Sequence, residues 1–243
     1  MGLRGETATA LRWSAGLKVG SQALSWAATF LVIRLLTPED YGLMAMTMAV
    51  VALAQRFSDF GFHTAIVRAP TLSREFVQTN LGLSIGLNLG LFTLLFAAAP
   101  VVSRYFGEDI TWYVRGVATV FLLAPLGMAY SALLARALEF RRLSLINEGG
   151  GQIGSVTSLA LAVAGFGVWA LVGGVVAGAV SRALLLVALA PDRYHPTFSR
   201  AAARRHFRFG SFVALQNVLR WLSDQIDVLV LGRLLPTAAL GGY

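Results

Sequence analysis

The sequence predicts an all-α membrane protein, a polytopic bundle of spanning helices. Of its 243 residues, 56% are hydrophobic and only 13% are charged, whereas about a quarter of a typical soluble domain is charged. The mean hydropathy is +0.68. Long apolar segments follow one another with short connections, and they lack the alternation of a membrane β-barrel. These observations predict helices that cross a bilayer.

Seven segments are long enough to span the hydrocarbon core, which takes about 20 apolar residues. We place them at residues 14–36, 43–67, 80–102, 113–138, 147–166, 168–190 and 208–235. The fifth and sixth are separated by Gly165-Phe166-Gly167, which predicts a tight helical hairpin. The chain has 25 glycines, many inside the spans, where small residues let helices approach closely. We interpret them as loose packing without a functional role.

The connections alternate in charge along the chain. Arginine and lysine gather at the N-terminus and in every second loop thereafter: Arg4, Arg12, Lys18; Arg68, Arg74; Arg136, Arg141, Arg142; Arg193, Arg200, Arg204 and Arg205. The other loops carry Glu39 and Asp40, then Arg104 against Glu108 and Asp109, then no charge. Because cytoplasmic loops are enriched in basic residues, this asymmetry predicts a cytoplasmic N-terminus.

The segment 195–209 predicts a basic helix at the membrane interface. It begins with proline and Ser/Thr, then combines arginines with Phe207 and Phe209, a composition typical of helices held by anionic membrane lipid. The formal net charge of +8 could also suggest a nucleic-acid partner. We expect no nucleic acid, because the basic residues are scattered between apolar runs and these aromatics lead directly into a span.

An internal repeat relates the seventh span to the first. "IRLLTPEDYG" (33–42) is similar to "GRLLPTAALG" (232–241), and "GLKVGSQ" (16–22) to "GSFVALQ" (210–216). Copies six spans apart run in the same direction, as in transporters built from two parallel lobes. We therefore divide the chain into a six-helix lobe (1–194), the basic interfacial segment (195–209) and the first helix of a second lobe (210–243). The C-terminal lobe of the same protein is then expected as a missing partner.

The N-terminal third carries a family resemblance. Arg34-Leu35-Leu36-Thr37-Pro38 with Tyr41-Gly42, followed by Phe57-x-Asp59-x-Gly61 with Ala65-Ile66, resembles polysaccharide exporters of the O-antigen flippase type. These belong to the multidrug/oligosaccharidyl-lipid/polysaccharide exporter superfamily. The resemblance implies a two-lobed transporter that carries polyprenyl-pyrophosphate-linked glycan across the bacterial inner membrane by alternating access, for surface polysaccharide biosynthesis.

Arg56 and Asp59 are the first candidate site residues. A charge at a helix centre costs about 2.5–3.5 kcal/mol on insertion scales, and residues three apart share a helix face. One interpretation is a mutually satisfied ion pair near the cytoplasmic end. The other is that Arg56 faces the cavity between lobes and binds pyrophosphate while Asp59 orients its guanidinium. The resemblance favours the second. Related lipid II flippases have an arginine of the central cavity shortly before a Gly-x-x-x-Ala stretch, and Arg56 lies at the comparable position before Gly61-x-x-x-Ala65.

The seventh span provides the remaining candidates. At 100° per residue its polar side chains fall on one face, which must contact protein or water and not lipid. That face lines the cavity between lobes or forms a static ion network. Arg115 and Arg182 are interpreted mainly as interfacial, and the amides elsewhere in the spans as interhelical hydrogen-bonders. The candidate residues of the seventh span are Gln216, Arg220, Asp224 and Asp227; the amides are those of Gln22, Asn80, Asn88 and Gln152.

The sequence disfavours an enzyme. Every predicted loop is short, the three histidines have no spacing typical of a metal site or a triad, and neither a cysteine nor a P-loop occurs. We expect no catalytic residues, metal or cofactor. Two alternatives stay open. A cation-coupled multidrug exporter of the same superfamily is disfavoured because the first span has no carboxylate between Lys18 and Glu39. A non-transporting structural membrane fragment is disfavoured by the polar faces.

Overall fold

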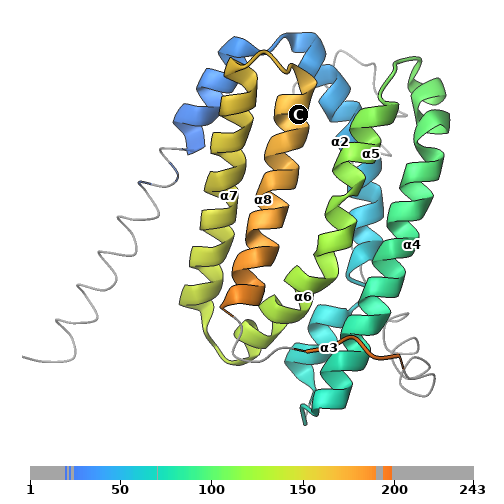
Figure 1. Cartoon of the computed structure of the whole chain (residues 1–243), viewed down its shortest axis with the longest axis vertical. Coiled ribbons are helices and arrows are strands. Elements are labelled where there is room, and N and C mark those ends of the chain that lie inside the picture. Colours follow the sequence, from blue (N-terminus) through green and yellow to red (C-terminus); the bar gives the residue numbers. More distant parts are fainter. Residues whose placement is uncertain (1–19, 21, 23–24, 70, 190–193, 199–243) are drawn as a thin grey trace, which may run out of the picture.

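The computed structural model describes residues 20, 22, 25–69, 71–189 and 194–198 of the chain. Within these ranges the regular structure is entirely helical. A first helix, Ser25–Leu35, is followed by α2 (Pro38–Ser58), α3 (Phe62–Arg68), α4 (Arg74–Phe106), α5 (Thr111–Ala118), α6 (Val120–Arg136), α7 (Phe140–Val163) and α8 (Val168–Ala188). Figure 1 shows the long helices side by side in one bundle. The predicted all-α membrane fold is confirmed.

The helices follow the predicted spans, but two of the spans are interrupted. The second predicted span, 43–67, is not continuous: α2 ends at Ser58 and α3 begins at Phe62. Thr119 divides the fourth span into α5 and α6. Among the described residues, three segments are long and apolar enough to cross a membrane, namely Arg74–Phe106, Thr111–Arg136 and Val168–Ala188. The predicted seventh span lies outside the described residues.

The helix ends separate the loops into two sets. The turn before α2, the α4–α5 loop and the α7–α8 loop lie at the upper end in Figure 1, whereas the α3–α4 and α6–α7 loops lie at the lower end. The lower loops begin or end at arginines, and Glu39 and Asp40 lie in the first turn of α2 at the upper end. The arginine-bearing loops and the acidic turn before α2 thus lie at opposite ends of the bundle, as the sequence predicted.

The Thr37-Pro38-Glu39-Asp40 motif starts α2. Thr37 is the N-cap: the backbone N of Asp40 donates to its Oγ1 (3.2 Å), and its own backbone N donates to Oδ2 of Asp40 (2.9 Å). Such a reciprocal capping box satisfies two free N–H groups, and proline at the first helical position needs no partner for its nitrogen. The motif therefore has a local structural role.

The α7–α8 hairpin is packed backbone against backbone. Gly165 and Gly167, with φ of 81° and 53°, make the turn. A Cβ atom on Gly154 would lie 2.7 Å from the carbonyl oxygen of Gly174, and one on Gly150 would lie 3.0 Å from Cβ of Arg182. The interpretation as loose packing is wrong for Gly174 and Gly178, because they face Gly154 and Gly150 and permit close contact between the two helices. Gly86 and Gly90 of α4, in contrast, face open space.

Buried amides of α4 hold the broken second span. Oγ of Ser58 donates to Oδ1 of Asn88 (2.5 Å), Nδ2 of Asn88 donates to the carbonyl of Ser58 (3.1 Å), and Nδ2 of Asn80 donates to the carbonyl of Phe62 (3.3 Å). On α7, Nε2 of Gln152 donates to Oγ of Ser25 (2.8 Å). These three amides are interhelical hydrogen-bonders, as predicted. Apolar clusters fill the rest of the interior, the largest around Val51, Phe121 and Val172.

Residues 194–198 run across the lower end of the bundle. The backbone N of Thr197 donates to the carbonyl of Gln78 on α4 (3.2 Å), and the Tyr194 ring lies 6.5 Å from that of Tyr130 on α6. The first residues of the predicted interfacial segment, 195–198, are therefore not helical, and Thr197 contacts α4. Residues 199–209 lie outside the described part of the chain.

Candidate functional site

The break between α2 and α3 contains both candidate residues of the second span. Asp59 is the C-cap of α2, Phe60 has a φ of 41°, and Gly61 has a φ of 81°. Glycine accepts this left-handed conformation without strain, and it lets the chain leave one helix and begin another within three residues. The Phe57-x-Asp59-x-Gly61 pattern is thus a helix break inside a span.

The Asp59 side chain is hydrogen-bonded to the backbone of α3. Its Oδ1 accepts a hydrogen bond from the backbone N of His63 at 2.9 Å, close to the start of that helix. A carboxylate at a helix N-terminus satisfies a free N–H and interacts favourably with the helix dipole. Among the described residues, the ion pair found within 4.0 Å joins Arg142 to Glu139, not Arg56 to Asp59. The Arg56–Asp59 ion pair, one of the two interpretations of these residues, is therefore not formed in this structure, where Oδ1 of Asp59 binds the α3 backbone.

Arg56 is left exposed on α2, and no described residue accepts a hydrogen bond from its guanidinium. It lies in the last turn of α2, with α3 still to follow before the loop at the lower end. An arginine within a predicted span that has no partner among the described residues is a candidate for contact with water or a ligand. Gln216, Arg220, Asp224 and Asp227 lie outside the described residues, so their position relative to Arg56 stays a prediction.

We expect Asp59→Ala to lower the stability of the bundle, by about 0.5–2 kcal/mol, the usual cost of losing a helix cap. Asp59→Ser should retain most of the stability, because a serine hydroxyl can also accept the bond from the His63 backbone. Thermal unfolding of the detergent-solubilised protein measures both. Equal losses for alanine and serine would show that Asp59 stabilises the fold by some means other than capping.

The opposite end of α3 is capped by Arg136 of α6. Its Nη1 donates to the carbonyl oxygens of Ile66 (3.0 Å), Val67 (3.2 Å) and Ala69 (2.6 Å). The last carbonyls of a helix have no partner within the helix, and a cation there also interacts favourably with the dipole. A helix of seven residues is thus held at its start by Asp59 and at its end by Arg136.

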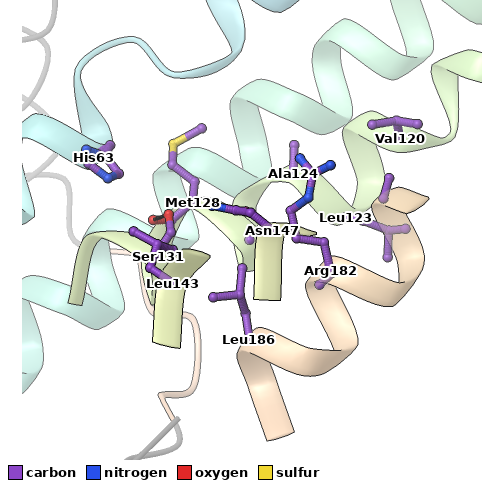
Figure 2. A pocket seen from close by; sticks show the side chains of 13 residues that line it. His63, Val120, Leu123, Ala124, Met128, Ser131, Leu143, Asn147, Arg182 and Leu186 are labelled. Atoms are coloured by element: carbon purple, nitrogen blue, oxygen red, sulfur yellow. Dashed lines mark hydrogen bonds between the residues drawn. The ribbon is translucent and has the colours of Figure 1, made fainter. Parts of the chain in front are cut away.

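A cavity of about 400 Å³ opens beside α3, between α6, α7 and α8. Its polar lining consists of His63, Ser131, Asn147 and Arg182, and its apolar lining includes Leu123, Met128, Leu143 and Leu186. In Figure 2, Arg182 reaches from α8 toward Ala124, Asn147 lies between Arg182 and Met128, and His63 approaches from α3. The volume is in the range of small-molecule pockets, about 300–1,000 Å³.

Most of the polar side chains in this cavity have no partner among the described residues. Oγ of Ser131 donates to the carbonyl of Met128 (2.9 Å). Within the described part of the chain, no hydrogen bond or ion pair engages the Arg182 guanidinium, the Asn147 amide or the His63 ring. Arg115 differs: its Nε donates to the carbonyl of Phe96 (3.2 Å), and its guanidinium lies over the rings of Phe96 (4.5 Å) and Trp112 (5.0 Å).

Sequence reasoning therefore did not place Arg182 in a cavity of this lobe. The mainly interfacial interpretation suits Arg115, whose aromatic partners are typical of membrane interfaces, but Arg182 lines a cavity. The available signal was that Arg182 is the one charged residue in the sequence of α8. An isolated charge in an otherwise apolar span is by default a candidate functional residue.

Comparisons with known proteins agree with the fold. The family described as "Polysaccharide biosynthesis protein" matches residues 31–243. The chain is 26% identical over 247 residues to the lipopolysaccharide biosynthesis protein WzxC of Escherichia coli, covering 100% of this chain and 50% of that protein. It is 28% identical over 246 residues to the succinoglycan biosynthesis transport protein ExoT of Rhizobium meliloti, covering 95% and 47%.

A third relative is the teichuronic acid biosynthesis protein TuaB of Bacillus subtilis, 29% identical over 197 residues, covering 78% of this chain and 40% of that protein. The chain spans about half the length of the curated relatives it matches. No solved structure matches it significantly.

Proposed function

Because the chain belongs to this family of polysaccharide biosynthesis proteins, we propose that the complete protein translocates lipid-linked oligosaccharide across the bacterial inner membrane. The translocation proceeds by alternating access between two lobes and supplies surface polysaccharide biosynthesis. The described helices belong to the first lobe, and the relatives' extra length provides the second. The name of the relative from Rhizobium meliloti, a biosynthesis transport protein, supports transport over catalysis, and the proposal needs no cofactor.

The proposal depends most on one observation about a candidate binding residue: Arg56 has no partner among the described residues. Its guanidinium is exposed on α2, and the nearby carboxylate of Asp59 is engaged by the His63 backbone. A pyrophosphate linker offers the charged oxygens that an arginine binds with two parallel hydrogen bonds. Arg56 then contacts the linker of a polyprenyl-pyrophosphate-linked glycan from the first lobe, and Gln216, Arg220, Asp224 and Asp227 form the facing wall.

The orientation follows from the charged loops. The end of the bundle with Arg68, Arg74 and Arg136 lies in the cytoplasm, and the end with Glu39 and Asp40 faces outward. Because the pyrophosphate is common to carrier-linked glycans, contacts to it are independent of the sugar. The substrate class is therefore set by the linker.

Arg56→Ala should reduce glycan display at the cell surface by about tenfold or more, the loss expected when a charge-assisted hydrogen bond of about 1.5–3 kcal/mol is removed. Arg56→Lys should recover only part, because an ammonium keeps the charge but not the fork. The measurement is display per folded transporter in cells that carry the complete protein as their sole copy. Gln55→Ala, the neighbouring exposed polar position on α2, is the matched control.

The double variant Arg56→Ala/Asp59→Ala separates the two residues. Asp59→Ala should lower the amount of folded protein through its lost cap, whereas display per molecule should equal that of Arg56→Ala alone. Normal display per molecule from the double variant would show that Arg56 is not part of the binding site.

A further inference from the structure

The cavity between α3, α6, α7 and α8 does not include Arg56 in its lining, and its chemistry points to a ligand of its own. It lies within the described lobe, and its lining comes from four helices that are packed on one another. We infer that it binds the phosphate headgroup of an anionic membrane lipid, with the apolar part of the lipid against Leu123, Leu143 and Leu186.

The charge of the cavity favours an anion. None of its described lining residues is acidic, and Arg182 places a permanent positive charge in it. Asn147 supplies amide N–H donors, and His63 can supply a ring N–H. A guanidinium with no protein partner in an apolar span is energetically unfavourable, and a bound phosphate would offset that cost with charge-assisted hydrogen bonds.

The packing fixes the base of Arg182, whose side chain is otherwise exposed. A Cβ on Gly150 would lie 3.0 Å from Cβ of Arg182, so the base of the arginine is held against the α7 backbone. Its head extends toward Ala124 of α6 in Figure 2. Arg182 is six residues before the end of α8 at Ala188, about 9 Å along the helix axis at about 1.5 Å per residue. The guanidinium is thus carried fewer than two helical turns from the end of α8 that lies beside the arginine-bearing loops.

The cavity also favours a group attached to an apolar chain over a free ion. Leu and Met side chains form much of its lining, and a volume of about 400 Å³ exceeds what a single phosphate needs. The guanidinium and the amide would bind the phosphate oxygens, and the leucines would pack against the first part of an acyl or prenyl chain. The same chemistry is offered by anionic phospholipid and by a polyprenyl phosphate.

The test uses the absence of cysteine from the chain. Ser131→Cys places a thiol in the cavity, and Thr71→Cys places one in the exposed α3–α4 loop at the same end of the bundle as a control. The purified full-length protein is held in maltoside detergent, and the maleimide reaction rate is followed with phosphatidylglycerol, polyprenyl phosphate, inorganic phosphate or phosphatidylcholine. We expect phosphatidylglycerol or polyprenyl phosphate to slow labelling of the Ser131→Cys variant and to leave labelling of the Thr71→Cys variant unchanged.

Arg182→Gln, introduced beside Ser131→Cys, should raise the protecting concentration about tenfold or more, because it removes a charge-assisted contact of about 1.5–3 kcal/mol. Arg115→Gln, whose arginine is already engaged by Phe96 and Trp112, should leave protection unchanged. Asn147→Leu, on a different helix, should also weaken protection. It provides the same test if the Arg182→Gln variant does not fold. Protection by one lipid but not the other, or by inorganic phosphate as well, identifies the source of the phosphate.

Native mass spectrometry provides a measurement that needs no cysteine. The wild-type protein should retain a phosphate-bearing lipid that Arg182→Gln loses. Equal protection by phosphatidylcholine, or protection and retention that persist in Arg182→Gln, would overturn the inference. Because neither assay involves transport, their failure is distinguishable from failure of the proposed translocation.

Discussion

Gly154→Ala is expected to destabilise the bundle by about 1–3 kcal/mol, the usual cost of overpacking a tight interior, and Gly154→Leu by more. The new Cβ would lie 2.7 Å from the carbonyl oxygen of Gly174 and 3.3 Å from Cα of Gly178. Both neighbours are backbone atoms, so relief requires α7 and α8 to move apart. Thermal unfolding in detergent and the fraction of monodisperse protein after heating measure the effect.

Gly151→Ala is the matched control on the same helix. A Cβ there meets nothing within 4 Å, and alanine is favoured over glycine inside a helix by about 0.5–1 kcal/mol. We therefore expect neutral or slightly raised stability. If Gly151→Ala and Gly154→Ala lowered the unfolding temperature equally, close contact between α7 and α8 would not be the cause.

Replacing Arg136 is expected to have the second large effect. Arg136→Gln removes a charged donor from three carbonyl oxygens at the end of α3. Hydrogen bonds to a charged group contribute about 1.5–3 kcal/mol, and half-buried carbonyls without partners add a penalty. We expect a loss of about 2–3 kcal/mol, with Arg136→Lys intermediate because its ammonium keeps the charge but does not occupy the position of Nη1.

Arg142→Gln is the control for Arg136. Arg142 pairs with Glu139 at 2.7 Å, but its side chain is 60% exposed, and an exposed ion pair of this kind contributes about 0–1 kcal/mol. Hydrogen exchange at the amides of residues 62–68 locates the effect. Arg136→Gln should accelerate exchange in α3, and unchanged exchange there would contradict the capping role.

Much of the fold could be predicted because apolar length and charged loops directly reflect the bilayer. The break at residues 59–61 could not be predicted in this way. The break follows an uncharged run, residues 43–55, and the apolar pattern resumes with Phe62 and Ile66, which are buried. Asp59 and Gly61 are typical helix-end residues, yet the prediction of a spanning helix took Asp59 as a charge that needs an ionic partner. The structure provides a backbone N–H instead.

The candidate site shows the same limit. Arg56 could be found from the sequence because it interrupts an uncharged run. That Asp59 binds the backbone of α3 and not Arg56 depends on the turn at Phe60 and Gly61, whose φ values are positive. The Arg182 cavity depends on four helices converging, which no single segment reveals. The close α7–α8 contact likewise requires the register between Gly154 and Gly174, and spacing within one helix does not fix that register.

The most direct test of the proposed translocation is movement of the substrate across a membrane. The complete protein is reconstituted into liposomes with a polyprenyl-pyrophosphate-linked oligosaccharide in both leaflets, and a membrane-impermeant glycosidase is added outside. Wild-type protein should let the enzyme digest nearly the whole pool, because inner-leaflet substrate reaches the outside, whereas Arg56→Ala should slow digestion of the inner-leaflet part. Digestion that stops at the outer-leaflet part with wild-type protein, as in protein-free liposomes, would contradict the account.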